Sequence, residues 1–178
     1  MRSRTLRTQN VLAAVEEDRL LKLWEGLGYY SRVRNLKKAA QVILADHGGE
    51  FPSDYEAVRA LPGIGDYTAG AVCSIAFSLP TPAVDGNVLR VLSRLRADRE
   101  PIDLPAVKKR VQRELEAIYP ADCPGEFTQA LMELGATVCL PNGAPLCDRC
   151  PAKNFCTALK EGSIDRIPVK AAKKARRI

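Results

Sequence analysis

The sequence predicts an all-α protein, and three observations lead to that prediction. Apolar residues recur every three or four positions along much of the chain, which is the spacing of one helix face. Alternating runs of β-branched and aromatic residues, which are typical of strands, are scarce. Turn residues separate the periodic segments and indicate where helices end, at Gly26, Gly48–Gly49, Pro62–Gly63 and Pro80.

The composition is that of a globular domain, with one unusual segment at the end. Of the 178 residues, 46% are hydrophobic and 27% are charged, which excludes a disordered chain. No apolar run reaches the roughly 18 residues of a membrane helix and no signal peptide opens the chain, so we expect a cytoplasmic protein. The whole net charge of +6 comes from residues 166–178, a basic tail that is either solvated or in contact with DNA.

The same spacing predicts the helices in chain order. Residues 1–10, MRSRTLRTQN, have no apolar periodicity, so they are either a disordered leader or the end of something that is missing. Periodic segments then predict helices over 17–25, 33–46, 54–60, 66–77, 86–95, 125–138 and, as a short helix, 153–160.

The clearest helical stripe runs from residue 104 to residue 118. Its apolar residues step by three or four positions through Leu104, Val107, Val111, Leu115 and Ile118. Asp103 is a typical N-cap, Pro105 suits the first turn and Pro120 ends the helix.

A glycine-rich turn, LPGIGDYTAG at residues 61–70, joins two of these helices. Gly63 and Gly65 allow backbone angles that a Cβ resists, and Ile64 between them can insert into the core. Asp66 can cap the helix that follows. The backbone N–H groups of such a turn face outward and bind phosphate without reading sequence, so we favour a phosphate-binding hairpin over a plain connection.

Four of the six cysteines are clustered near the end of the chain. They are Cys139, Cys147, Cys150 and Cys156, and seven, two and five residues lie between successive members. Disulfides are not expected in the cytoplasm, so the cluster indicates metal ligands. Four thiolates suit either a zinc ion or an iron–sulfur cluster, and the spacing does not choose between them. Cys73 is expected in the core, and Cys123 receives no function.

Several motifs together resemble those of one enzyme family. LPGIGDYTAGAV, followed by AVDGNVLRVLSR at 83–94, is similar to the helix-hairpin-helix and catalytic-aspartate segments of base-excision DNA glycosylases. LWEGLGYYSRVRNLKKAA at 23–40 and FTQALMELGATVC at 127–139 resemble MutY-type adenine DNA glycosylases in particular. The resemblance covers residues 11–169. It implies a helix-hairpin-helix fold, excision of adenine from a mispair in double-stranded DNA, a monomer, and a 4Fe–4S cluster on the four cysteines.

The resemblance also implies roles for three residues of the active site. Asp85 is the carboxylate that stabilises the cationic sugar when the N-glycosidic bond breaks, a role compatible with capping a helix. Asn87 orients the sugar or a water molecule. Tyr67 stands where the lyases resembling endonuclease III have the Lys amine that forms a Schiff base, so an efficient lyase step is not expected.

Aromatic and basic side chains are the other candidates for DNA contact. The resemblance assigns Tyr29 to a wedge in the duplex, where stacking on a base is worth about 1–3 kcal/mol. Trp24 and Tyr30 are expected in the core. Arg32 and Arg149 are candidates for phosphate contacts, although a solvated face accounts for Arg32 equally well.

The sequence departs from the family pattern at both ends. The family has a general-acid Glu in an N-terminal helix, whereas no Glu precedes Glu16 here. The family also continues into a domain that recognises oxidised guanine, whereas this sequence stops in what resembles the linker. We therefore expect a glycosylase core truncated at both ends, with impaired excision.

The expected organisation is two helical lobes with the active cleft between them. Residues 1–83 form the lobe with the hairpin, 84–162 the iron–sulfur lobe, and 163–178 the basic tail or linker. Two alternatives stay open: a pyrimidine-lesion glycosylase similar to endonuclease III, and a non-catalytic DNA-binding iron–sulfur protein.

Overall fold

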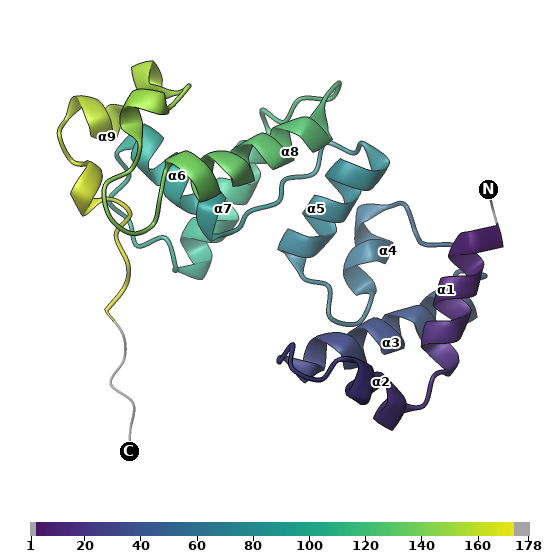
Figure 1. Cartoon of the computed structure of the whole chain (residues 1–178). Helices are drawn as coiled ribbons and strands as arrows, with labels where there is room; N and C mark the ends of the chain where they lie inside the picture. The colour runs from purple at the N-terminus through teal and green to yellow at the C-terminus, as the bar shows by residue number, and fades with distance from the viewer. Residues whose placement is uncertain (1–2, 173–178) are drawn as a thin grey trace. The chain divides into compact units, whose positions relative to one another are not determined.

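The computed structural model describes residues 3–172, which are helical throughout their regular parts (Figure 1). No strand occurs in this range, so the predicted all-α class is confirmed. None of the helices described is long and apolar enough to cross a membrane. The chain forms two compact units, Met1–Ala69 and Gly70–Ile178, which divide inside α5 (Asp66–Phe77). The lobe boundaries expected from the sequence stay a prediction, and residues 173–178 of the basic tail lie outside the described residues.

The first unit contains four helices before α5. They are α1 (Ser3–Ala14), α2 (Glu17–Leu23), α3 (Tyr30–Asp46) and α4 (Tyr55–Ala60). α1 is a correction, because residues 3–10 carry no periodic pattern and no helix was predicted there. α1 packs along α3, and Gln41 Nε2 donates a hydrogen bond to the Ala13 carbonyl at 3.2 Å. Tertiary contact therefore accounts for this helix better than its own sequence does.

The core of the first unit fixes the glycine turn. Ala39 and Ile43 of α3 are buried together with Leu61, and Ile64 packs against them. The predicted insertion of Ile64 into the core is thus confirmed. At the start of α4 the Asp54 carboxylate caps the helix by accepting a hydrogen bond from the Ala57 N–H at 2.9 Å.

The second unit continues α5 and adds three longer helices and several short ones. The longer ones are α6 (Gly86–Arg96), α7 (Pro105–Glu116) and α8 (Pro124–Glu133). A π-helical turn over Leu134–Val138 extends α8. The short ones are the 3₁₀ turns Cys147–Arg149, Lys153–Phe155 and Ile164–Arg166, and α9 (Thr157–Lys160).

α7 follows the predicted stripe in its middle but not at its ends. Val107, Val111 and Leu115 are buried against α6 and α8, whereas Leu104 and Ile118 are exposed. The predicted cap at Asp103 is wrong: Leu104 is the N-cap residue, and the Asp103 carboxylate accepts a hydrogen bond from the Ala171 N–H at 2.8 Å. The carboxylate thus binds a segment distant in sequence instead of its own helix.

Small residues and hydroxyls bring α5 close to its neighbours. A Cβ on Gly70 would lie 2.0 Å from the Pro82 carbonyl oxygen, so only glycine fits there. The Ser74 hydroxyl donates to the Gly70 carbonyl at 2.8 Å and accepts from Thr128 of α8 at 2.7 Å. Cys73 is fully buried, as predicted. This packing supports the chain that leads to α6, where the candidate active site begins.

Candidate active site and metal centre

Asp85 stands at the N-terminus of α6 with both carboxylate oxygens engaged. Oδ1 accepts a hydrogen bond from the Val88 N–H at 2.8 Å, which makes Asp85 the N-cap. Oδ2 accepts one from Asn87 Nδ2, also at 2.8 Å. Asp85 is half-buried and Gly86 beside it is exposed, so the carboxylate is held in one orientation at an accessible place.

Arg90, one turn further along α6, holds Asn87 in place. Its Nη2 donates to the Asn87 Oδ1 at 2.9 Å and to the Gly135 carbonyl at 2.7 Å. Its Nε donates to the Cys139 carbonyl at 2.7 Å. The side chain is buried, and this burial lowers the pKa of the guanidinium. A continuous set of hydrogen bonds therefore joins Asp85 through Asn87 and Arg90 to the first clustered cysteine.

Gly135 allows the π-helical turn to reach this network. A Cβ built on Gly135 would lie 2.5 Å from the Asn87 Cβ, which is closer than real side chains approach. Sequence reasoning missed both Gly135 and Arg90. Arg90 could have been found from its pattern, because an Arg among Val88, Leu89, Val91 and Leu92 interrupts an apolar helix and must be paired if buried.

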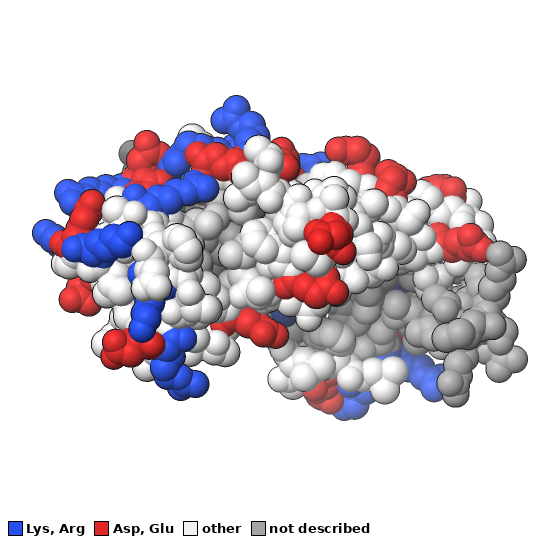
Figure 2. Space-filling model, turned by 90° about the horizontal axis from the view of Figure 1, so that it is seen from above, with Lys and Arg blue, Asp and Glu red and all other residues white. Residues whose placement is uncertain are grey.

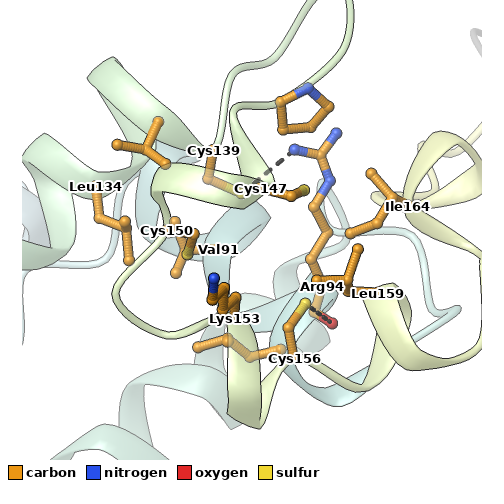
Figure 3. A pocket seen from close by; sticks show the side chains of 13 residues that line it. Val91, Arg94, Leu134, Cys139, Cys147, Cys150, Lys153, Cys156, Leu159 and Ile164 are labelled. Atoms are coloured by element: carbon orange, nitrogen blue, oxygen red, sulfur yellow. Dashed lines mark hydrogen bonds between the residues drawn. The ribbon is translucent and has the colours of Figure 1, made fainter.

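The four clustered cysteines line one pocket (Figure 3). The remaining wall is mostly apolar, with Val91, Leu134, Leu159 and Ile164 among its residues. Arg94 forms part of the pocket wall. Its Nη1 donates a hydrogen bond to the Cys139 Sγ at 3.3 Å, and its carbonyl accepts one from the Cys156 Sγ at 3.4 Å. Arg94 is another functional candidate that sequence reasoning missed, and it lies one turn after Arg90 on the same helix.

The thiols influence one another across the pocket. Burial raises the pKa of the Cys147 thiol most, and Cys156, Cys139 and Cys150 raise it further. In the part of the chain that the structure describes, no three His, Cys, Asp or Glu side chains are grouped closely enough to hold a metal ion. Cys123 is exposed and lies outside the pocket, as Cys73 does.

The glycine turn has the predicted backbone conformation at Gly63 but not at Gly65, whose φ is not positive, so the prediction for Gly65 is wrong. Gly63 has a φ of +81°, and a Cβ there would lie 2.6 Å from the Asn35 Cβ, so glycine is required on both grounds. Gly65 faces open space. Asp66 is the first residue of α5, and its carboxylate pairs with the Arg59 Nε of α4. The side chain predicted as a cap is therefore an ion-pair partner.

Two left-handed glycines shape the turn before α3. Gly26 and Gly28 have positive φ angles, and the Trp24 Nε1 donates to the Gly28 carbonyl at 2.9 Å. Tyr29 follows with a φ of 48° and is 75% exposed, as a wedge requires. The Arg32 guanidinium lies 5.0 Å from the centre of the Tyr29 ring, so the two candidates for DNA contact are adjacent.

Three predictions for single residues have different outcomes. Tyr30 is 40% exposed, so its expected place in the core is wrong. Arg149 is exposed at the end of its 3₁₀ turn. On one face of the molecule, basic side chains lie among acidic ones (Figure 2). Tyr67 is 42% exposed and belongs to the first unit, whereas Asp85 belongs to the second, so their grouping in one site stays a prediction.

Known proteins resemble the chain in sequence. The adenine DNA glycosylase of Mus musculus is 42% identical over 161 residues, which are 88% of this chain and 31% of that protein. The Homo sapiens enzyme is 44% identical over 83% of this chain and 27% of its own length. The enzyme of Buchnera aphidicola (Acyrthosiphon pisum) is 38% identical over 88% of this chain and 45% of its own length. The chain thus spans less than half of these relatives.

Solved structures resemble it in fold. A thermostable thymine-DNA glycosylase has a TM-score of 0.77 at 27% identity, over 86% of this chain and 70% of its own. A trapped endonuclease III–DNA covalent intermediate has a TM-score of 0.74 at 30% identity, over 88% of this chain and 71% of that chain. The family model for HhH-GPD superfamily base excision DNA repair proteins matches residues 3–121. Since that match covers more than half of the chain, the chain belongs to the HhH-GPD superfamily of base excision DNA repair proteins.

Proposed function

We propose that this chain is the glycosylase core of an adenine DNA glycosylase. It hydrolyses the N-glycosidic bond of adenine that is mispaired with oxidised guanine or guanine in double-stranded DNA. The observation that carries the proposal is the fixed, accessible carboxylate of Asp85, in a chain that is 42% identical to an adenine DNA glycosylase.

Asp85 acts on the positive charge that develops on the sugar. Breaking the bond to the base leaves an oxocarbenium-like sugar, which a nearby carboxylate stabilises. The Val88 N–H and the Asn87 amide keep the carboxylate in one orientation, so little reorganisation is needed when the charge appears. Arg90 acts one step further away, as a positioning residue for Asn87.

Departure of adenine also requires a proton donor. General acids typically contribute a factor of about 10² to 10⁴ in rate. Asp85 is assigned to the charge of the sugar, so this proton comes from another group.

Tyr67 supports hydrolysis over a lyase reaction. A lyase step of the Schiff-base kind needs an amine, which a phenol cannot replace. The structural likeness to endonuclease III and to a thymine-DNA glycosylase keeps a pyrimidine lesion as the second candidate substrate. The absence of an amine at position 67 makes it the weaker one.

DNA is bound mainly through its phosphates. The turn with Gly63 and Gly65 presents backbone N–H groups that suit a phosphate. Tyr29 stacks in the duplex beside Arg32, and Arg149 contributes charge from the cysteine loop. None of these groups reads a base edge, so we assign the choice of adenine to the active site at Asp85.

The four clustered cysteines hold a 4Fe–4S cluster. Their chemistry fits, because this cluster takes four thiolates and the pocket wall supplies an apolar surround. Four thiolates also suit a single zinc ion. The resemblance to MutY-type adenine DNA glycosylases favours the 4Fe–4S cluster over zinc. When bound, the cluster serves as a structural cross-link of the loop that contains Arg149.

A single-turnover assay on three duplexes tests the function. Duplexes carry adenine opposite oxidised guanine, a pyrimidine lesion, or no lesion, and base release and binding are measured on each. We expect release of adenine alone. Release from the pyrimidine duplex would indicate the second candidate, and binding without any release would indicate a non-catalytic DNA-binding protein.

A further inference from the structure

The glycine hairpin has an acidic residue at the place where a phosphate would approach. Asp66 is the first residue of α5, directly after Gly65, and its side chain is 65% exposed. Its carboxylate pairs with the Nε of Arg59, which lies on α4 on the other side of the turn and is 49% exposed. The ion pair therefore bridges the two helices that the turn connects.

The same helix end attracts both Asp66 and a phosphate. The first N–H groups of α5 have no partner within the helix, and the helix dipole makes this end positive. A carboxylate in the first turn stabilises the helix for that reason. A phosphate approaching the same N–H groups meets the negative charge of Asp66, unless a cation offsets it.

Arg59 is the side chain placed to offset that charge. The hydrogen bond to Asp66 is the largest cause that raises the pKa of Arg59, and no other ion pair of either side chain is recorded among the described residues. The remaining guanidinium N–H groups of Arg59 are on an exposed side chain, beside the turn.

We propose that Arg59 and Asp66 set the affinity of the hairpin for duplex DNA, with Asp66 opposing the phosphate and Arg59 neutralising Asp66. This inference rests on the proposed DNA-binding function. According to this inference, the pair limits the affinity of the hairpin for DNA. Asp66 stabilises α5 but repels the phosphate, and Arg59 reduces that repulsion.

The test is a double-mutant cycle on the full chain. Fluorescence anisotropy with a labelled duplex measures the Kd of the wild type, Arg59→Ala, Asp66→Asn and the double variant at low and moderate salt. Arg113→Ala and Glu116→Gln on α7, both exposed, remove the same charges elsewhere and serve as matched controls. Circular dichroism checks that all variants fold.

We expect Asp66→Asn to tighten binding about two- to fivefold and Arg59→Ala to weaken it by a similar factor, the size typical of exposed charges. In the Asp66→Asn background, Arg59→Ala should weaken binding no more than Arg113→Ala does. Equal weakening in both backgrounds would mean that Arg59 binds phosphate directly, and it would overturn the inference.

The other outcomes are also decisive. Unchanged or weaker binding by Asp66→Asn, or a gain no larger than that of Glu116→Gln, would overturn the role of Asp66 while leaving DNA binding intact. If the wild type shows no salt-dependent binding to duplex DNA, both the proposed function and this inference fail together.

Discussion

In the proposed function Asp85 performs two tasks with one side chain, because a helix cap and an electrostatic catalyst need the same carboxylate. The cap uses Oδ1 and the Val88 N–H, while Oδ2 is fixed by Asn87. Asn is as good an N-cap as Asp, so the two tasks can be separated by substitution. The catalytic task alone depends on the negative charge.

Replacing Arg90 with Met should damage both stability and excision. The Gly135 and Cys139 carbonyls would lose a buried charged donor, and each unsatisfied group costs about 1–3 kcal/mol. We expect the free energy of unfolding to fall by about 3 kcal/mol in chemical denaturation and the excision rate to fall with it. Arg113→Met, on an exposed face, is the control. Unchanged stability of the Arg90 variant would contradict the network.

Gly135→Ala tests the close approach of the π-helical turn to Asn87. A Cβ at 2.5 Å from the Asn87 Cβ overpacks the site, and such changes cost about 1–3 kcal/mol. Thermal unfolding should therefore occur at a lower temperature in this variant. Gly65→Ala, where a Cβ meets open space, is the matched control and should unfold close to the wild type.

Among the elements, the loop from Cys139 to Cys156 contains little regular secondary structure. Cys147 begins one 3₁₀ turn and Cys150 follows it, while Cys156 lies between the next 3₁₀ turn and α9. Arg94 of α6 donates hydrogen bonds to the Cys139 Sγ and the Leu140 carbonyl. Few apolar side chains from this loop are buried, so the proposed cluster would supply much of its order when bound.

Cys147→Ser should lose iron and DNA affinity together. Purified wild-type protein should be brown, contain iron and lack zinc, whereas the variant should be colourless and bind duplex DNA more weakly. Cys123→Ser, outside the pocket, should keep both colour and affinity. Elemental analysis that finds one zinc and no iron in the wild type would reject the cluster.

The glycine hairpin is the second element with a separable role. Gly65→Glu places a carboxylate beside the N–H groups that we propose bind a phosphate, at a position where a Cβ meets open space. We expect weaker binding to every duplex alike, with Gly65→Ala nearly unchanged, in titrations at several salt concentrations. An affinity that does not fall as salt rises would be inconsistent with phosphate contacts.

For the whole molecule, the sequence predicted regular elements well and through-space pairings poorly. Helical periodicity and turn residues located α2 to α8, because amphipathic spacing and Gly or Pro boundaries are local signals. α1 was missed because it forms against α3. Asp103 and Asp66 were assigned to local caps, yet each binds a distant partner, Ala171 and Arg59.

The candidate site shows the same division. Asp85, Asn87 and the four cysteines were found from motifs, because their residue types carry the chemistry. Arg90, Arg94 and Gly135 were missed because their roles depend on which segments meet in space. An Arg in an apolar helix signals a buried partner but does not say which carbonyl or thiol that partner is.

Adenine release in single turnover, from a duplex with adenine opposite oxidised guanine, tests the central claim most directly. We predict that the wild-type chain releases adenine from this duplex, because the Asp85 carboxylate stabilises the cationic sugar. Asp85→Asn, which keeps the N-cap, should bind the duplex as tightly as the wild type and release no adenine. Adenine release that survives Asp85→Asn, or no release by the wild type, would contradict the account.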